Sequence, residues 1–229
     1  MNLSAHEIAE VSSLVMELCG ILLDESKGYL IESRLQSLVT EFKCNSYSEL
    51  VTQARLHRDR VLLTRIIDAI TTNETLFFRD TSPFEALQHK ALPELIDAKA
   101  KSAHPKRLRI WSAASSTGQE VYSIAMVLHE MIPNIASWDV NIHGTDISDG
   151  ALQQASSGTY SDFEIGRGLS PQLLNRYFTK SGSNYKVKDE LRSLVSFGKQ
   201  NLMEPFATTG PFDIIFCRNV VIYFTGAAR

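Results

Sequence analysis

Two polar side chains that can bind a ligand directly follow a strongly apolar run near the C-terminal end of the sequence. Arg218 and Asn219 come after Cys217 and residues 214–216, and such a run predicts a parallel strand buried on both faces. Open α/β sheets bind their ligands at the carboxyl ends of their strands. A guanidinium and an amide in apolar surroundings cost free energy unless they have partners. We therefore expect a bound cofactor beside Arg218 and Asn219.

A second candidate site lies in the turn from Ser115 to Glu120, which reads Ser-Ser-Thr-Gly-Gln-Glu. The turn stands where a dinucleotide-binding fold has its glycine-rich loop, but Gly118 is its one glycine, so a pyrophosphate would approach the backbone less closely. Asp146 lies at the tip of the next expected strand, where its carboxylate can accept hydrogen bonds from ribose hydroxyls. A nucleoside without a pyrophosphate therefore suits this loop better than NAD does. The alternative is an ordinary strand-to-helix turn.

The elements that must position these side chains form a strand–helix–strand unit. Residues 108–114 predict a strand, residues 121–131 have helical spacing, and residues 138–147 predict the next strand. This order, with an acid at the tip of the second strand, is typical of a βαβ unit in a parallel sheet. Two short strands are also expected, at residues 185–187 and 194–197, separated by a charged turn.

The first 70 residues predict a small bundle of helices. Ser4 and Glu7 form a capping-box pattern, and apolar residues then recur on one helical face. Solvated helix faces and docking to an acidic partner helix are both open interpretations of the basic side chains in this part. These are Lys27, Arg34, Lys43, Arg55, Arg58, Arg60 and Arg65.

The composition limits the class of protein. With 229 residues, of which 44% are hydrophobic, the chain can form a sizeable core in one or two domains. A net charge of −3 makes a nucleic-acid partner less expected. Three cysteines without a CxxC pair fit a reducing compartment, and six histidines without metal-ligand spacing predict no metal site. Since no signal peptide or membrane span is evident, we expect a cytoplasmic protein without direct membrane insertion.

Several motifs occur in one order along nearly the whole chain. They are Thr72 to Thr75 with Phe78-Arg79, Trp111 to Ala125, Thr145-Asp146-Ile147, Asn201-Leu202, and Cys217 to Phe224. This set resembles the CheR family of chemotaxis receptor methyltransferases, and residues 20–35 resemble its helical domain. The resemblance implies an α/β fold: a Rossmann-like S-adenosylmethionine-dependent methyltransferase domain with a small antiparallel β-subdomain, preceded by an all-α N-terminal domain.

On this resemblance we expect three parts of the chain. Residues 1–70 would form the helical, receptor-docking domain, and residues 71–82 would form a linker that contributes to the cofactor site. Residues 83–229 would form the methyltransferase domain, with the β-subdomain inserted at about residues 178–200. Because a methyltransferase sheet normally has seven strands, this domain would be incomplete at its C-terminal end, and the closing strands would follow residue 229.

The resemblance also implies S-adenosyl-L-methionine as methyl donor and glutamate side chains on the cytoplasmic helices of chemoreceptors as acceptors. Carried over by motif, the cofactor-binding residues would be Asn73, Thr75, Arg79, Glu120, Asp146, Asn201, Leu202, Arg218 and Asn219. Glu120 and Asp146 would hold the amino-acid and ribose portions of the cofactor between them. Arg79 and Tyr223 would lie nearest the transferred methyl group and are the expected catalytic residues.

The residue types agree with such a reaction. A glutamate carboxylate, with a reference pKa of about 4.3, is ionised at neutral pH and needs no general base. Alignment of the reacting atoms can contribute about 7–11 kcal/mol. Arg79 could orient the carboxylate through a charge-assisted hydrogen bond, and the ring of Tyr223 could pack near the sulfonium. Structural roles are the alternatives: a helix-flanking charge for Arg79, a core position for Tyr223, and a cap on the turn at Ser148 for Asp146.

The sequence departs from the family pattern in ways that bear on its partners. Gln119 and Val121 stand where the family often has glutamate and proline, but Glu120 is present, so cofactor binding is expected to persist. The hairpin around residues 181–184 is short, whereas members that tether to a receptor's C-terminal pentapeptide have a longer loop there. We therefore expect direct recognition of the methylation helices, without pentapeptide tethering. We also expect the protein to be a monomer.

Two other functions stay open at this point. One is an S-adenosylmethionine-dependent methyltransferase with a small-molecule or RNA acceptor, which competition between acceptors would separate from the first function. The other is a regulatory or docking module that binds S-adenosylmethionine without turnover. Cofactor binding without methyl transfer would indicate that module.

Overall fold

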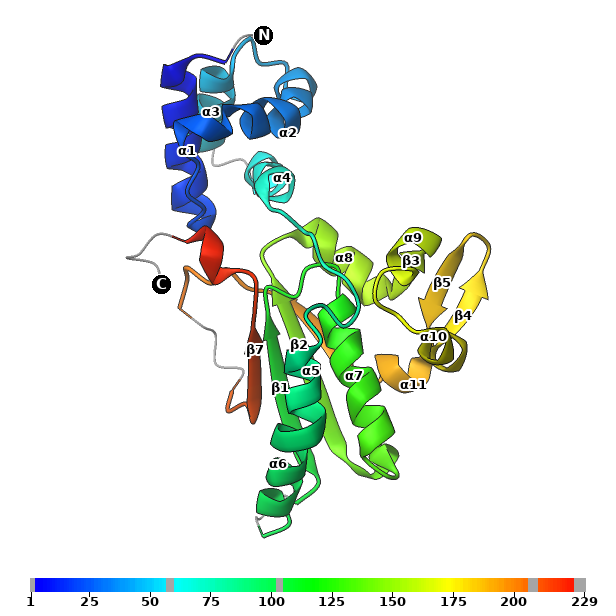
Figure 1. Ribbon diagram of the computed structural model, residues 1–229. Coiled ribbons are helices and arrows are strands. Elements are labelled where there is room, and N and C mark those ends of the chain that lie inside the picture. Colours follow the sequence, from blue (N-terminus) through cyan, green and yellow to red (C-terminus); the bar gives the residue numbers. More distant parts are fainter. Residues whose placement is uncertain (1–2, 57–59, 102–104, 206–209, 225–229) are drawn as a thin grey trace.

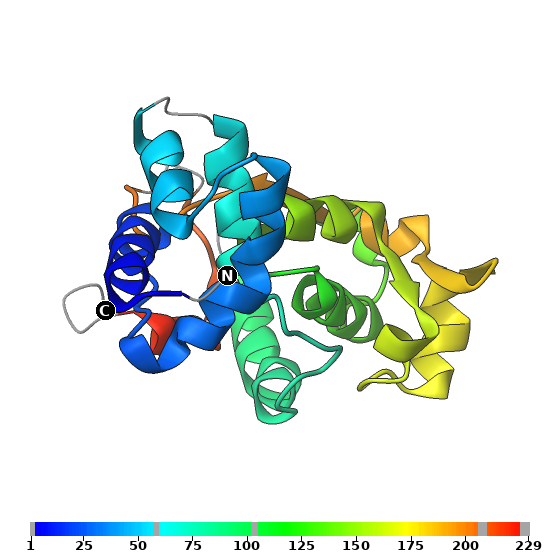
Figure 2. The ribbon, with the colours of Figure 1, turned by 90° about the horizontal axis from the view of Figure 1, so that it is seen from above.

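The computed structural model describes residues 3–56, 60–101, 105–205 and 210–224 (Figure 1). Arg58, one of the basic residues considered above, lies outside these residues. A group of N-terminal helices stands over one edge of an α/β part, and a small antiparallel sheet lies to the side of that part (Figures 1 and 2).

The helical part has its own apolar interior. The hydroxyl of Ser4 accepts a hydrogen bond from the backbone N–H of Glu7, and the Glu7 carboxylate accepts one from the backbone N–H of Ser4, which confirms the predicted capping box. The same carboxylate accepts from the backbone N–H of Tyr47 at 3.0 Å, so it also links two helices. The elements of this part are α1 (Ala5–Cys19), η1 (Glu25–Lys27), α2 (Gly28–Glu41), α3 (Tyr47–Leu56) and α4 (Arg60–Ile70).

Four parallel strands of the described chain form the centre of the α/β part, in the order β6-β2-β1-β7. They are β1 (Arg107–Ala113), β2 (Asp139–Asp146), β6 (Val195–Lys199) and β7 (Ile214–Cys217). The helix α7 (Gln119–Met131) connects β1 to β2, which confirms the predicted βαβ unit. In the register of the sheet Ala113 lies opposite both Thr145 and Cys217, so the carboxyl ends of three strands meet at one edge.

One face of this sheet is covered by α5 (Ser82–Ala86), the π-helical turn Leu87–Ala91, α6 (Leu92–Lys99) and α7 (Figure 1). Leu108 and Ile110 of β1 are buried in the core on that side. Ile215 of β7, in contrast, is 56% exposed. The expectation that residues 214–216 are buried on both faces is therefore wrong: β7 pairs with β1 alone among the described strands, and its alternate side chains face away from the helices.

The small antiparallel sheet has the order β3-β5-β4, with β3 (Thr159–Ser161), β4 (Phe178–Ser181) and β5 (Asn184–Val187). Its bounds differ from the expected 178–200. Residues 159–161 belong to it, whereas residues 195–199 pair with β2 in the parallel sheet. A three-residue strand is too short to show an alternating pattern, and the sequence alone did not indicate which sheet the later strand would join.

Short elements complete the α/β part. They are η3 (Ile135–Ser137), α8 (Asp149–Ser157), α9 (Asp162–Ile165), α10 (Pro171–Tyr177), α11 (Asp189–Arg192) and η4 (Val221–Tyr223). Together with the antiparallel sheet, α9 and α10 form a side unit beyond α8, as Figure 1 shows. We call residues 158–187 the side subdomain.

Candidate functional site

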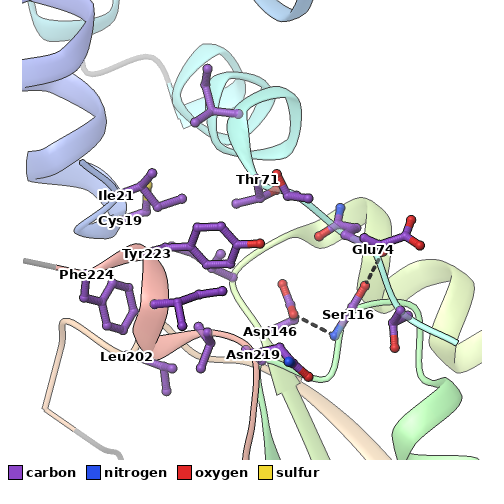
Figure 3. Close-up of a pocket in the computed structure, with 18 of the residues that line it drawn as sticks. Cys19, Ile21, Thr71, Glu74, Ser116, Asp146, Leu202, Asn219, Tyr223 and Phe224 are labelled. Atoms are coloured by element: carbon purple, nitrogen blue, oxygen red, sulfur yellow. Dashed lines mark hydrogen bonds between the residues drawn. The ribbon is translucent and has the colours of Figure 1, made fainter. Parts of the chain in front are cut away.

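A cavity of about 430 Å³ lies between the helical part and the carboxyl edge of the parallel sheet (Figure 3). All ten of the predicted site residues line it. They are Asn73, Thr75, Arg79, Glu120, Asp146, Asn201, Leu202, Arg218, Asn219 and Tyr223. The size is within the range of about 300–1,000 Å³ that is usual for small-molecule sites.

The register of the sheet brings these residues together. The loop that starts at Ala114 follows β1, Asp146 ends β2, and Arg218 follows β7, and these three strands end side by side. Asp146 also lies opposite Lys199 of β6, so the segment from Gln200 onward enters the same edge. Residues more than 100 positions apart therefore meet where parallel sheets bind their ligands.

Asp146 is held by the loop after β1 and by the turn that follows it. Its Oδ2 accepts from the backbone N–H of Ser116 at 2.7 Å, and its Oδ1 accepts from that of Ser148 at 3.0 Å. Figure 3 shows the first of these bonds on the cavity floor. The proposed cap at Ser148 thus exists, but each carboxylate oxygen keeps a second lone pair for a ligand. Burial raises the pKa of Asp146, against the opposing effect of these hydrogen bonds.

Glu120 and Arg218 form an ion pair in the wall of the cavity. Arg218 Nη1 donates to Glu120 Oε2 at 2.9 Å, and the two side chains are only 16% and 14% exposed. Ser112 Oγ donates to the other carboxylate oxygen at 2.7 Å. Burial raises the pKa of Glu120, although Ser112 and Arg218 favour its ionised form. Arg218 therefore has protein partners as well as a place in the cavity wall.

The inter-domain segment, residues 71–82, lies against the α/β part through backbone contacts. Ser116 Oγ donates to the carbonyl of Asn73 at 2.9 Å, and Arg79 Nη1 donates to the carbonyl of Glu74 at 2.8 Å. Ser123 of α7 accepts from the backbone N–H of Phe78 at 3.0 Å. Arg79 is half-buried and lines the cavity, which argues against the alternative of a surface charge.

The helical part closes the cavity on the opposite side. Ile21 pairs with Phe224 in an isolated antiparallel bridge, and the backbone N–H of Leu22 donates to the carbonyl of Tyr223 at 3.3 Å. Tyr223 is 38% exposed and its hydroxyl points into the cavity (Figure 3), which argues against an ordinary core position. Asn201 Nδ2 donates to the carbonyl of Leu18 at 2.8 Å, so this predicted cofactor residue also links the two domains.

Sequence reasoning missed several residues that line the cavity. They are Ile21, Leu22, Arg34, Ala114 and Gln200, among others. Ser115 and Ser116 also line the cavity, and they belong to the turn that the sequence indicated as a candidate site. Nothing in local periodicity could indicate Ile21 or Leu22, because their place depends on how two domains pack.

The loop after β1 has an unusual backbone. Ala114 and Ser116 have positive φ angles of 55° and 50°, a region that residues with a side chain rarely adopt. Gly118 follows with a φ of 93°, and a Cβ there would lie 2.9 Å from that of Ala155. Such strain persists only where surrounding structure fixes it, and it is typical of ligand sites.

Part of the basic surface of the helical part has partners within the chain. Arg34 of α2 donates to the carbonyls of Ile70 at 2.6 Å and Thr71 at 3.1 Å, where α4 ends. Arg55 pairs with Glu17 at 2.7 Å and Arg65 pairs with Glu41 at 2.9 Å. These three side chains are therefore less available to an acidic partner than the sequence alone indicates.

Neither a metal-binding cluster nor a membrane-spanning helix occurs among the described residues. No group of three or more His, Cys, Asp or Glu side chains is arranged to hold a metal ion in that part of the chain. Likewise, none of the helices described is long and apolar enough to cross a membrane.

Comparison with known proteins places the chain in a family. Residues 6–71 match the family described as "CheR methyltransferase, all-alpha domain", and residues 73–229 match "CheR methyltransferase, SAM binding domain". The chain therefore belongs to the CheR methyltransferase family. It is an S-adenosylmethionine-dependent methyltransferase with an all-α domain before an α/β domain, which confirms the predicted family, fold class and cofactor.

Curated relatives carry matching names. A "Chemotaxis protein methyltransferase" of Vibrio parahaemolyticus is 45% identical over 98% of this chain and 81% of its own length. A "Chemotaxis protein methyltransferase 1" of Pseudomonas aeruginosa is 45% identical over 92% of this chain and 77% of its own length. A "Chemotaxis protein methyltransferase" of Borreliella burgdorferi is 38% identical over the whole of this chain and 81% of its own length.

The residues in the cavity fit this cofactor. Ser115 Oγ is buried, lines the cavity and has no hydrogen-bond partner among the described residues, so it can serve a polar group of a ligand. Asp146 has free lone pairs for two hydroxyls, and Glu120 offers a carboxylate to an amino group. Apolar walls from Ile147 and Leu202 suit an aromatic base.

Proposed function

We propose that this chain transfers the methyl group of S-adenosyl-L-methionine to glutamate side chains on the cytoplasmic helices of chemoreceptors, forming methyl esters. It would act in the cytoplasm as a monomer, without a nucleic-acid partner. The names of the curated relatives, which are chemotaxis protein methyltransferases, support this proposal. The β4–β5 hairpin turns within the two residues between Ser181 and Asn184, which supports recognition of the receptor without pentapeptide tethering.

The observation that carries the proposal is the charge of the cavity wall. Lys27 and Arg79 line it, Arg218 is paired there with Glu120, and no histidine is among its described lining residues. Cationic groups attract an ionised carboxylate and hold it by charge-assisted hydrogen bonds. A carboxylate acceptor needs no general base, whereas a hydroxyl or amine acceptor has to lose a proton.

The proposed roles follow the position of each residue. Asp146 would hold the ribose hydroxyls, Glu120 the amino group, and Asn73 and Thr75 the side that faces the inter-domain segment. The other members of the cofactor set would complete the pocket. These are Arg79, Asn201, Leu202, Arg218 and Asn219. When bound, S-adenosylmethionine supplies a methyl group on a positively charged sulfur, and Arg79 and Tyr223 would orient the acceptor oxygen toward it.

The proposal includes a division of the chain into two domains and a linker. The family matches at residues 6–71 and 73–229 support a helical docking domain of residues 1–70 and a methyltransferase domain of residues 83–229. The contacts of Asn73 and Arg79 described above support residues 71–82 as a linker that contributes to the site.

Replacing Tyr223 by alanine is expected to lower kcat about tenfold and to leave the affinity for the cofactor product within about twofold. The reason is that the ring would exclude water and keep the acceptor oxygen in line with the methyl group, and about 1.4 kcal/mol of lost alignment lowers the rate tenfold. Tyr223→Phe keeps the ring and should retain most of kcat. Steady-state kinetics with calorimetric binding of S-adenosylhomocysteine measures both quantities. Equal losses in the two variants would show that the hydroxyl, not the ring, is needed.

Cofactor affinity is expected to fall on acidification, and to do so at a pH above the usual pKa of a glutamate carboxyl. The ionised Glu120 carboxylate would bind the ammonium group, and its pKa is raised by burial. Affinity is therefore present above this raised pKa and is lost as the pH falls through it. Titrations from pH 8 to pH 5 measure the loss. Glu120→Gln should bind more weakly at neutral pH and show a flatter profile, and an unchanged slope in that variant would contradict the role of Glu120.

Incubation with methyl-labelled S-adenosylmethionine and a cytoplasmic chemoreceptor fragment tests the proposed function. We expect label on the fragment that mild alkali releases as methanol, because methyl esters are hydrolysed by base. A fragment with glutamine at the methylated positions should remain unlabelled. Alkali-stable label, or preferential transfer to an RNA or small-molecule competitor, would contradict the proposal that receptor glutamates are the acceptors. Cofactor binding with no labelled product would favour a docking module.

A further inference from the structure

We propose that Arg167 is a positioning residue for the cofactor site. It lies in the side subdomain, and it would fix the inter-domain segment that carries Asn73 and Thr75 by holding Glu74 between them. The inference rests on the proposed role of Asn73 and Thr75 in holding the cofactor.

The first contact is an ion pair between the inter-domain segment and the side subdomain. Arg167 follows α9, and its Nη2 donates to Glu74 Oε1. The guanidinium also lies over the ring of Phe163, with 5.4 Å between its central carbon and the ring centroid. The hydrogen bond from Arg167 lowers the pKa of Glu74, so the pair stays charged throughout the neutral range. Arg167 is thus held in one orientation toward Glu74.

The neighbouring residues form a close backbone contact. Gly168 has a φ of 89°, and a Cβ added to it would lie 1.9 Å from the carbonyl oxygen of Phe77. The ring of Phe77 packs edge-on against Tyr160 at 5.1 Å and Phe178 at 5.6 Å between centroids, both in the side subdomain. The inter-domain segment therefore lies directly on this subdomain, with no room for a side chain between them.

The contact reaches the cavity through Glu74. Its side chain points away from the Asp146 and Tyr223 side of the cavity (Figure 3), while Asn73 and Thr75 on either side of it line the wall. Its backbone carbonyl accepts from Arg79 Nη1 at 2.8 Å. A shift of Arg167 would therefore move the peptide groups of Glu74, and with them the side chains that face the ligand. Because Arg167 binds the side chain of Glu74 and Arg79 binds its backbone carbonyl, the Arg167–Glu74 ion pair can set the position of this part of the cavity wall.

A double-mutant cycle with Arg167→Gln and Glu74→Gln tests the inference in the full chain. Exposed ion pairs have small energies, so we expect each single variant to raise the Kd for S-adenosylhomocysteine about three- to fivefold. The double variant should bind no more weakly than either single variant. The charge-reversed pair Arg167→Glu with Glu74→Arg should recover most of the affinity. Hydrogen exchange of the amides of residues 73–79 should become faster in Arg167→Gln.

Arg176→Gln is the matched control, because Arg176 forms a comparable surface ion pair with Glu130 at 2.8 Å within reach of the same antiparallel sheet. We expect it to bind the product as the original chain does. If the original chain binds and Arg167→Gln binds equally well, or if Arg176→Gln shows the same loss, the positioning role of Arg167 is wrong. If the original chain itself does not bind, the cofactor role of Asn73 and Thr75 fails, and this inference fails with it.

Discussion

Replacing Asp146 by asparagine is expected to weaken binding of S-adenosylhomocysteine about 10- to 100-fold. Hydrogen bonds to charged groups contribute about 1.5–3 kcal/mol, and each 1.4 kcal/mol corresponds to a factor of ten in Kd. The carboxylate has four lone-pair sites, of which two accept from the backbone N–H groups of Ser116 and Ser148. Asparagine has one acceptor oxygen, so it cannot serve both backbone groups and a ribose.

Calorimetric titration of the variant beside Asp149→Asn measures this effect. Asp149 lies three residues further on, where it forms an exposed ion pair with Lys199 at 2.8 Å. We expect the Asp149 variant to bind as the original chain does, since its carboxylate does not line the cavity. Equal affinity of the Asp146 variant and the original chain would show that the ribose is bound elsewhere.

Replacing Arg218 by glutamine is expected to lower the free energy of unfolding by about 3 kcal/mol, because removal of one partner of a buried ion pair leaves the other charge uncompensated. Besides Glu120, the guanidinium donates to the carbonyl of Arg79 at 2.6 Å and to Asp80 at 3.0 Å. Its loss would therefore also loosen the inter-domain segment. Urea denaturation measures the change.

The double variant Arg218→Gln with Glu120→Gln should recover part of this loss, because it removes the uncompensated carboxylate as well. Lys199→Gln, which breaks the exposed pair with Asp149, is expected to cost at most about 1 kcal/mol. A loss below about 1 kcal/mol in Arg218→Gln would mean that the ion pair does not stabilise the fold and that Arg218 is present for the ligand alone.

The edge of the sheet where the cavity lies could be predicted from the sequence. Asp146 ends one parallel strand and Arg218 follows another, and the carboxyl ends of neighbouring parallel strands lie at the same edge of a sheet. Their partners could not be predicted from spacing, since Arg218 reaches Glu120 across 98 positions of the chain. The sequence indicated that Arg218 needed a partner, and the structure gives it two carboxylates and a backbone carbonyl.

The residues that the helical part contributes to the cavity could not be predicted from the sequence for a different reason. Ile21 and Leu22 lie between two helices, where periodicity carries no information about distant contacts. The bridge from Ile21 to Phe224 depends on how the helical part packs against the α/β part. The predicted bounds of the antiparallel sheet were wrong for a similar reason, since the three residues Thr159–Ser161 form a strand only because β5 pairs with them.

A crystal structure of the chain grown with S-adenosylhomocysteine would show where the cofactor binds. We expect the ligand in the cavity of Figure 3, with its ribose hydroxyls on Asp146 and its sulfur facing Arg79 and Tyr223. Electron density for the ligand elsewhere, or a sulfur turned away from Tyr223, would contradict the assigned site.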